Sequence, residues 1–413
     1  MQLHSSLRTL DIKQSNKMNV LQYIRQHKES TKPEIAKQLG YSAPTVSKLV
    51  DELVEINYVK ITGTGTSTDQ GGKRPKLFAF NPMGGSIVAL HVGVQTIEAG
   101  LLNLEGEVLF HRSEKIKSKD TSDKIVEAIE KHIEMLMEKS EQIGLRTLGI
   151  GIGCPGLVEF ATGTILKSYK IHVLENVQLG TLIRQKFDCP IWIDNECNNL
   201  ALAEKWFGDG GDHETAINLL TEAGIGAGII IDHQLIRGAD NSFGEVGHTV
   251  IDMHGPECDC GNHGCWELFA STEAVIKRLE STREQSDYLC KAGAHKEVQM
   301  ELIAEAIQAG DDWASQIAIK ELGEFLAIGI VNLVNIFNPN SINIHGEMKM
   351  LGQPLLEEVK IRVRQKALPA PAKRVRIDFS KLGDHAHVIG AGALCVKELF
   401  ESPDELFRRS SNM

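Results

Sequence analysis

Three cysteines and two histidines lie close together in one short segment of the chain. They occur in two motifs, Gly244-Glu245-Val246-Gly247-His248 and Cys258-Asp259-Cys260-Gly261-Asn262-His263-Gly264-Cys265-Trp266-Glu267. Thiolate and imidazole are ligands that zinc prefers, and three cysteines with one histidine fill its four tetrahedral positions. The segment therefore predicts a closed, structural Zn²⁺ site, with either His248 or His263 completing the set of cysteines.

Two carboxylates bracket the cysteines: Glu245 precedes them and Glu267 follows them. Glycines between the cysteines allow the backbone to turn tightly enough to aim three sulfur atoms at one point. Because four nitrogen and sulfur ligands already complete a zinc site, the carboxylates are expected to bind something other than the metal.

Length and composition predict a cytoplasmic protein. The chain has 413 residues, for which two or three domains are the usual expectation, and its apolar content of 42% supports ordinary buried cores. No apolar run approaches the length of a membrane span, and the segment from Met1 to Asn19 lacks the apolar core of a signal peptide. Five of the eight cysteines are scattered, which fits reduced thiols plus one metal site.

The charge of the chain is unevenly distributed. Residues 1–80 contain 12 Lys/Arg and 7 Asp/Glu, a net charge of +5 within a chain whose total is −11, so the remaining residues carry −16. A small basic head on a large acidic body indicates nucleic-acid binding by the head alone.

The basic head has the pattern of a winged helix-turn-helix. A helix is expected from Asn16 to Lys28, a second is capped by Thr31, and a third buries a stripe of apolar residues, Val46, Leu49, Val50 and Leu53. In such proteins the N-terminal end of the last helix enters the major groove of DNA. The small or polar residues there are the expected DNA contacts: Ser42, Ala43, Thr45, Ser47 and Lys48. A plain three-helix packing unit is the alternative.

Two strands of a wing are expected at Tyr58–Ile61 and at Lys76–Phe80. The tip between them ends in Gly71-Gly72-Lys73-Arg74-Pro75, which is narrow and cationic. Lys73 and Arg74 are therefore candidates to enter an A·T-rich minor groove, and a solvated linker is the alternative.

After residue 80 the pattern changes to strands that alternate with helices, which is typical of an α/β protein. Pro82, Gly84 and Gly85 mark residues 81–86 as a linker. The tail from Lys397 to Arg409 is amphipathic and indicates a helix for packing or for oligomer formation.

With these motifs the chain resembles the ROK family (repressors, open reading frames and sugar kinases), and within it the full-length transcriptional repressors. The resemblance covers essentially the whole chain. It rests on the Gly-Glu-x-Gly-His and Cys-x-Cys-Gly-x-x-Gly-Cys-x-Glu motifs, together with Gly153-Cys154-Pro155-Gly156-Leu157-Val158 and Asn195-Glu196-Cys197-Asn198. The winged head also matches the repressor branch and is absent from ROK kinases.

The resemblance implies a winged helix-turn-helix at 1–80 followed by a two-lobed, actin/hexokinase-like body. The first lobe would span 87–195, completed by 385–413, and the second lobe 196–384 with the zinc loop. It implies that a sugar binds in the cleft between the lobes, and that the metal ligands are His248, Cys258, Cys260 and Cys265. The implied sugar-binding residues are Gly156, Asn195, Glu196, Glu245, His248 and Glu267. Carboxylates and an amide suit the vicinal hydroxyls of a sugar.

The residues that would handle ATP depart from the kinase pattern. The family's first phosphate loop, Asp-x-Gly-Gly-Thr, is replaced by His91-Val92-Gly93-Val94-Gln95, and the second by Glu222-Ala223-Gly224-Ile225-Gly226. Valine blocks the close backbone approach of a phosphate, and Glu222 adds negative charge. The catalytic aspartate of the family is Glu196 here, one methylene longer, which displaces a catalytic base. We therefore expect no catalytic residues and no kinase activity.

These features predict a sugar-responsive repressor of carbohydrate uptake or metabolism genes. Its expected partners are an operator in double-stranded DNA and a sugar or sugar phosphate. Because operators of such proteins usually contain two half-sites, a homodimer or a dimer of dimers is expected. Two alternatives are an ATP-dependent sugar kinase and a repressor that is controlled by a phosphotransferase-system protein.

Overall fold

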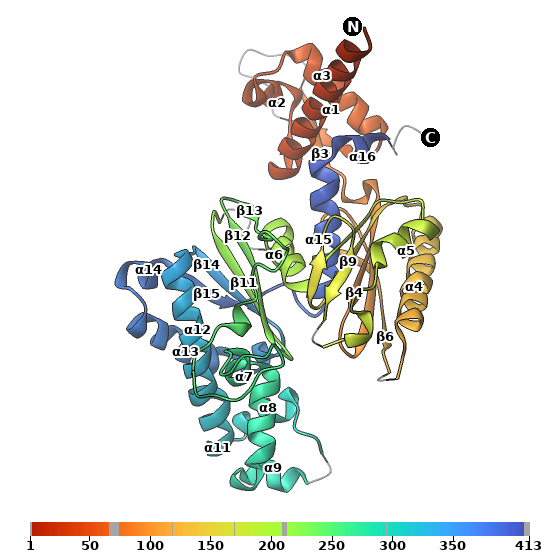
Figure 1. Ribbon diagram of the computed structural model, residues 1–413. Helices are drawn as coiled ribbons and strands as arrows, with labels where there is room; N and C mark the ends of the chain where they lie inside the picture. The colour runs from red at the N-terminus through yellow and green to blue at the C-terminus, as the bar shows by residue number, and fades with distance from the viewer. Residues whose placement is uncertain are drawn as a thin grey trace. The chain divides into compact units, whose positions relative to one another are not determined.

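A computed structural model describes residues 2–65, 74–117, 119–168, 170–208, 213–293 and 296–408 (Figure 1). Contacts between residues divide the chain into two compact units. The first unit contains Met1–Gly153, Gln178–Ile193 and His387–Met413, and the second contains Cys154–Val177 and Asp194–Ala386. This grouping differs from the expected lobes chiefly in residues 154–177, which belong with the second unit. Residues 194–195 and 385–386, expected in the first lobe, also fall in the second unit. The grouping also joins the N-terminal head to the first unit.

The head is a winged helix-turn-helix, as the sequence predicts. Its helices are α1 (Gln2–Gln26), α2 (Lys32–Leu39) and α3 (Ala43–Glu55), and its antiparallel sheet has the order β1 (Glu29–Ser30), β3 (Lys76–Phe80), β2 (Val59–Thr64). Helix α1 begins well before Asn16, the residue expected from the sequence. A repeat of Leu3, Leu7 and Leu10 at helical spacing extends the apolar pattern toward the N-terminus and could have indicated this.

Caps fix the turn between α2 and α3. Thr31 and Glu34 form a reciprocal capping box at the start of α2, and the Thr31 backbone N–H donates to Glu34 Oε2 at 2.8 Å. Gly40 ends α2 in the left-handed conformation, with φ of 68°, which glycine adopts without strain. The Ser42 side chain then accepts a hydrogen bond from the Thr45 backbone and caps α3. Residues close together in the sequence therefore fix the turn that sets the angle between α2 and α3.

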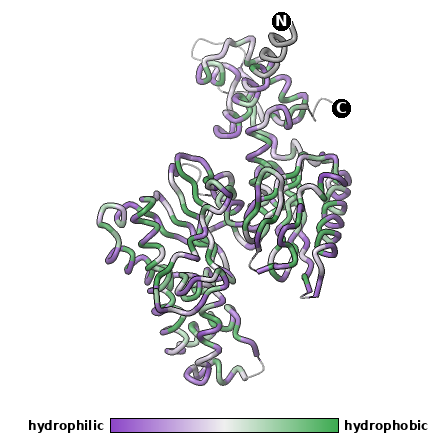
Figure 2. Tube along the Cα trace, in the orientation of Figure 1, coloured by the Kyte–Doolittle hydropathy of each residue, from purple (hydrophilic) through white to green (hydrophobic). Residues whose placement is uncertain are grey.

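The body of the first unit is a five-stranded sheet in the order β10-β7-β4-β5-β6. Its elements are η1 (Pro82–Gly84), β4 (Ser86–Val92), β5 (Thr96–Leu102), β6 (Val108–Lys115), α4 (Ser122–Gln142), β7 (Thr147–Cys154), α5 (Leu179–Lys186), β10 (Ile191–Asn195) and α15 (Ala386–Glu401). Helix α4 buries Ile125, Ile129 and Ile133 at helical spacing. Figure 2 shows the hydrophobic strands of the sheet and the alternating character of α4.

The C-terminal helices connect this sheet to the winged head within the first unit (Figure 1). Helix α15 passes so close to β7 that a Cβ at Gly151 would overlap the backbone of Ala391. Helix α16 (Pro403–Arg408) follows, and the Tyr58 hydroxyl donates to the carbonyl oxygen of Leu406 at 3.3 Å. The rings of Phe400 and Phe407 are buried against the head. The described part of the amphipathic tail therefore comprises the end of α15 and helix α16, which pack against the head.

The second unit contains a five-stranded sheet in the order β13-β12-β11-β14-β15 and a two-stranded sheet of β8 and β9. The strands are β8 (Leu157–Glu159), β9 (Thr164–Lys167), β11 (Ala216–Thr221), β12 (Ile225–Ile231), β13 (Gln234–Leu235), β14 (Ser341–His345) and β15 (Arg376–Phe379). β11 pairs antiparallel with β12 and parallel with β14, as β4 does with β5 and β7 in the first unit.

Helices cover both faces of this sheet. The longer helices of the second unit are α6 (Glu196–Phe207), α8 (Thr272–Ser281), α10 (Met300–Gln308), α12 (Leu322–Phe337) and α13 (Gly352–Lys366). The shorter ones are η2 (His172–Leu174), η3 (Val246–His248), α7 (Glu267–Ala270), η4 (Arg283–Gln285), α9 (Asp287–Ala292), α11 (Asp312–Ser315), η5 (Gln316–Glu321), η6 (Glu347–Leu351) and α14 (Pro369–Arg374). Ile217 of β11 lies in the core with α12 and α13, whereas its neighbour Ala216 packs with α6. No helix among the described residues is long and apolar enough to span a membrane.

Candidate functional site

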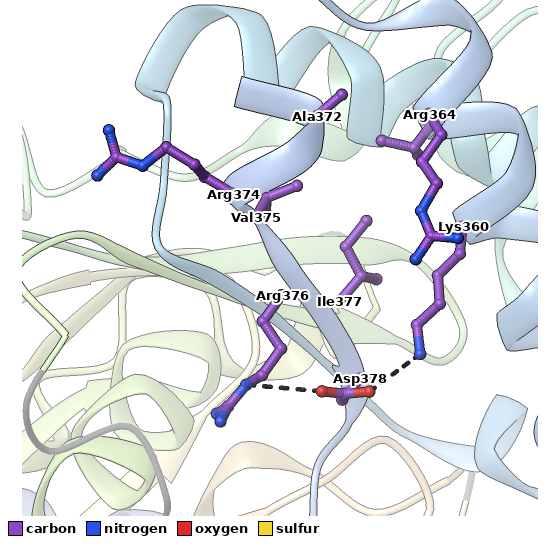
Figure 3. A pocket seen from close by; sticks show the side chains of 9 residues that line it. Lys360, Arg364, Ala372, Arg374, Val375, Arg376, Ile377 and Asp378 are labelled. Carbon is purple, nitrogen blue, oxygen red and sulfur yellow. Dashed lines mark hydrogen bonds and ion pairs between the residues drawn. The ribbon is translucent and has the colours of Figure 1, made fainter. Parts of the chain in front are cut away.

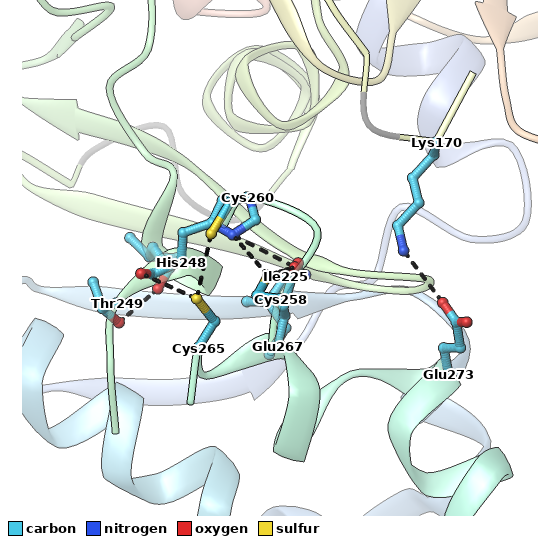
Figure 4. Close-up of polar contacts among 10 residues, drawn as sticks. Lys170, Ile225, His248, Thr249, Cys258, Cys260, Cys265, Glu267 and Glu273 are labelled. Carbon is cyan, nitrogen blue, oxygen red and sulfur yellow. Dashed lines mark hydrogen bonds and ion pairs between the residues drawn. The ribbon is translucent and has the colours of Figure 1, made fainter. Parts of the chain in front are cut away.

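The four expected metal ligands of the second unit converge on one point. One ligand atom from each of His248, Cys258, Cys260 and Cys265 lies within 4.8 Å of the others. The Sγ atoms of Cys260 and Cys265 are 3.6 Å apart, and Cys258 Sγ is 3.6 Å from His248 Nδ1 (Figure 4). Zn–S bonds of about 2.3 Å place tetrahedral sulfur ligands about 3.8 Å from each other. The donor atoms and their spacing therefore fit a zinc ion.

The backbone of the loop explains how these side chains meet. Gly261 and Gly264 have φ values of 87° and 68°, and a Cβ at Gly264 would overlap the carbonyl oxygen of Asp252. Next to Cys265, the indole of Trp266 is fully buried and its Nε1 donates to the carbonyl oxygen of Phe325 at 2.8 Å. Trp266 thus anchors one end of the cysteine loop in the core that surrounds α12.

The geometry distinguishes the two candidate histidines. His248 closes the short helix η3 and directs Nδ1 toward Cys258. His263 is exposed and is not part of the cluster. The arrangement of the described residues therefore favours His248, as the resemblance implied.

The two carboxylates that bracket the cysteines lie beside the cluster. Glu267 begins α7, and its Oε1 is 3.5 Å from His248 Nδ1 and 3.4 Å from Cys258 Sγ, as Figure 4 shows. Glu245 is half-buried. Partial burial raises its pKa, the charge of His248 lowers it, and the charges of Glu267 and Glu196 raise it again. Glu196 and Glu267 thus lie close enough to Glu245 for their charges to act on it. Carboxylate oxygens can accept hydrogen bonds from a ligand with several hydroxyl groups.

The remaining candidate sugar residues also lie in the second unit. Asn195 caps α6, and its side-chain nitrogen donates to the carbonyl oxygen of Gly156 at 2.8 Å. Gly156 has φ of 102°, and a Cβ there would overlap the backbone of Lys167. Glu196 is the next residue and occupies the first turn of α6. The amide and carboxylate are therefore held on a rigid helix start.

The sequence did not indicate Asp194 and Arg237, which support this part of the site. Asp194 is 1% exposed; its Oδ1 accepts from the Asn195 backbone and from Asn198, and its Oδ2 accepts from Arg237 Nε at 2.9 Å. Arg237 Cζ also lies 3.9 Å from the centroid of the Phe160 ring. This ion pair joins segments that are far apart in the sequence, so no local spacing could have revealed it.

Carboxylates also lie near Glu222–Gly226, the segment expected to correspond to the family's second phosphate loop. Burial raises the pKa of Glu347, and the negative charges of Glu222 and Glu301 raise it further. A phosphate chain has the same sign of charge as these groups, so its approach to Glu222 would be opposed electrostatically.

The structure separates the candidate DNA contacts of the head. Ser42, Ala43, Thr45, Lys48 and Arg74 are exposed. Ser47 is half-buried, and its hydroxyl accepts from Lys32 Nζ at 3.0 Å and donates to Asp51 at 3.3 Å, so this hydroxyl is already engaged within the protein. Lys73 lies outside the described residues.

Comparison with known proteins agrees with this architecture. Residues 87–398 match the ROK family, and residues 14–60 match a winged helix-turn-helix DNA-binding family. The chain is 38% identical over 396 residues to the xylose repressor of Caldicellulosiruptor bescii, covering 95% of this chain and 98% of that one.

Two solved structures resemble the protein at 27% identity. One is a ROK family transcriptional regulator, homolog of the E. coli MLC protein, with a TM-score of 0.83 over 97% of this chain and 100% of that one. The other is a ROK family glucokinase from Streptomyces griseus in complex with glucose and AMPPNP, with a TM-score of 0.67 over 75% of this chain and 99% of that one. The first likeness extends over nearly the whole chain, including the winged head, and the protein therefore belongs to the ROK family.

Proposed function

We propose that this protein is a DNA-binding repressor of genes for carbohydrate uptake or metabolism, and that a sugar controls its affinity for the operator. The observation that carries the proposal is its similarity to a xylose repressor over 95% of the chain, with a winged helix-turn-helix and a ROK body in one polypeptide. The exposed N-terminal end of α3 would enter the major groove, where Lys48 provides a positive charge.

The proposed sugar site consists of Gly156, Asn195, Glu196, Glu245, His248 and Glu267. Asn195 caps α6 and donates to the carbonyl oxygen of Gly156, and Glu267 Oε1 lies 3.5 Å from His248 Nδ1. Carboxylates accept from sugar hydroxyls, and an amide both donates and accepts. The Asp194–Arg237 ion pair holds the start of α6 in place.

The proposed metal is Zn²⁺, held by His248, Cys258, Cys260 and Cys265. Its role is structural, because four protein ligands leave no position open for substrate. Coordination of His248 through Nδ1 would fix the orientation of its ring and leave the other ring nitrogen for the sugar.

A kinase reaction is the second candidate, since a ROK glucokinase shares the fold of the body. Phosphoryl transfer requires a phosphate cradle and neutralisation of its negative charge. Here Val94 and Gln95 replace the small and hydroxyl residues of the first loop, and Glu222 lies near Glu347 at the second. We therefore propose that the body retains sugar recognition without ATP chemistry.

Two further proposals concern the assembly and its control. A two-fold operator requires two heads, so we propose that the protein acts as a homodimer or a dimer of dimers. Control by a phosphotransferase-system protein remains the alternative to control by a sugar, and an absence of any sugar response would favour it.

A sugar screen tests the effector site. Thermal unfolding of the whole protein with D-xylose, D-glucose, N-acetylglucosamine and their phosphates should identify a sugar that raises the midpoint, because it binds the native state. Glu245→Gln should lower the affinity for that sugar by about 10-fold or more, since a hydrogen bond to a charged group contributes roughly 1.5–3 kcal/mol.

Glu297→Gln is the matched control, because Glu297 is an exposed carboxylate elsewhere in the second unit. Isothermal titration should give it the affinity of the wild type. Equal sugar affinity in both variants and the wild type would show that Glu245 is not in the site. Separately, phosphorylation of the sugar by ATP at ordinary enzyme rates would refute the repressor-only assignment.

A further inference from the structure

A cationic pocket lies in the second unit among α13, α14 and β15 (Figure 3). Its volume is about 270 Å³, and its apolar lining includes Val363 and Ile377. Four basic side chains surround it, Lys360, Arg364, Arg374 and Arg376, and the single carboxylate in the lining is Asp378. The side chains that line the pocket thus have a net charge of +3. The chain after residue 80, to which they belong, has a strongly negative net charge.

Asp378 is already shared by two of these cations. Lys360 Nζ lies 3.2 Å from Asp378 Oδ1, and Arg376 Nε lies 3.5 Å from Asp378 Oδ2. Figure 3 shows the guanidinium group of Arg364 on the same side of the pocket as the Lys360 side chain, and that of Arg374 on the opposite side of Val375 and Ile377. Arg364 and Arg374 have no ion-pair partner among the residues that the structure describes. Two guanidinium groups are therefore available to an anion.

Two ordinary explanations for basic residues apply here only in part. Cations in the last turns of α13 and α14 complement the helix dipoles, and charges on β15 protect an edge strand from pairing. Other basic residues of α13 are neutralised, however: Arg362 pairs with Glu358 at 2.7 Å, and Lys366 lies 3.4 Å from Glu324. Among the cations that line the pocket, Lys360 and Arg376 share Asp378, and Lys360 also lies 3.6 Å from Glu357. The two that lack such neutralisation among the described residues are Arg364 and Arg374, and both line this one pocket.

We propose that this pocket binds a small phosphomonoester as a ligand separate from the sugar effector. A planar guanidinium presents paired N–H donors that match two phosphate oxygens, which an ammonium group alone cannot do. The apolar lining lowers the local dielectric and strengthens the attraction, and it accommodates a compact organic group attached to the phosphate. The pocket shares no residue with the proposed sugar and metal sites.

Calorimetric titration of the whole protein at fixed ionic strength tests the proposal. The probes are glycerol 3-phosphate, inorganic phosphate and malonate, the last as an anion without a phosphoryl group. Glycerol 3-phosphate should bind at least 10-fold more tightly than malonate, and the double variant Arg364→Gln/Arg374→Gln should lose at least 10-fold in affinity for it. The unfolding midpoint of this variant without ligand should remain that of the wild type.

The double variant Arg278→Gln/Lys291→Gln is the matched control, since it removes the same charge from exposed positions elsewhere in the second unit. It should bind glycerol 3-phosphate as the wild type does. The proposal is overturned if neither phosphate probe binds at millimolar concentration, if malonate binds as tightly, or if the control variant loses affinity to the same extent. Sugar binding can be measured independently in every variant, so a failure here is distinguishable from a failure of the proposed effector site.

Discussion

Cys260→Ser is expected to empty the metal site and to loosen the loop that carries Glu267. Cys260 Sγ lies 3.6 Å from Cys265 Sγ, so its removal leaves three ligands around the ion. Structural zinc binding is coupled to folding, with apparent free energies of about 10–16 kcal/mol in zinc-finger peptides. Because Trp266 anchors the same loop in the core, the loss should also lower the stability of the second unit.

Elemental analysis should find about one zinc ion per chain in the wild type and close to none in the variant. The thermal midpoint should fall by roughly 5–10 °C, given about 2–4 °C per kcal/mol for domains of this size. Cys290→Ser is the control, since Cys290 is an exposed thiol outside the cluster. A wild-type protein that contains no metal after purification with zinc, or a Cys260→Ser protein that keeps it, would contradict the assignment.

Ala43→Asp should abolish most operator binding without harming the fold. Ala43 is exposed in the first turn of α3, where a carboxylate would face DNA phosphates. Like charges brought together at an interface cost several kcal/mol, so a loss of about 100-fold or more is expected. The same carboxylate is favourable at a helix N-terminus, so the substitution should not unfold the head.

Ala370→Asp provides the control for this effect. Ala370 is likewise an exposed alanine in the first turn of a helix, α14, but it belongs to the second unit. Fluorescence anisotropy with a duplex selected by the wild-type protein from random DNA should give this variant wild-type affinity. Equal operator affinity in the Ala43→Asp protein would show that α3 does not face DNA as proposed.

The features that the sequence predicted well are those encoded by neighbouring residues. Thr31 and Glu34 form their capping box because three residues separate them, and the cysteines converge because glycines turn the loop between them. The winged head and the α/β body follow from the same local periodicities. Each of these inferences needed only a short window of sequence.

The features that the sequence did not reveal depend on partners that are far apart along the chain. Ser47 is on the expected face of α3, but Lys32 from α2 engages its hydroxyl. Arg237 is 43 residues from Asp194, and nothing in the spacing marks the two as a pair. Arg364 and Arg374 line one pocket only because α13 and α14 lie next to each other. Tertiary packing determines such pairs, and a single sequence does not display it.

The most direct test of the central claim is reciprocity between the two ligands. The affinity of the identified sugar should be measured with and without operator DNA, and that of the operator with and without the sugar. If the sugar site and the winged head are coupled, both ratios should be equal, within the range of about 5–150-fold that corresponds to 1–3 kcal/mol. A sugar affinity that does not change when operator DNA is added would contradict the account.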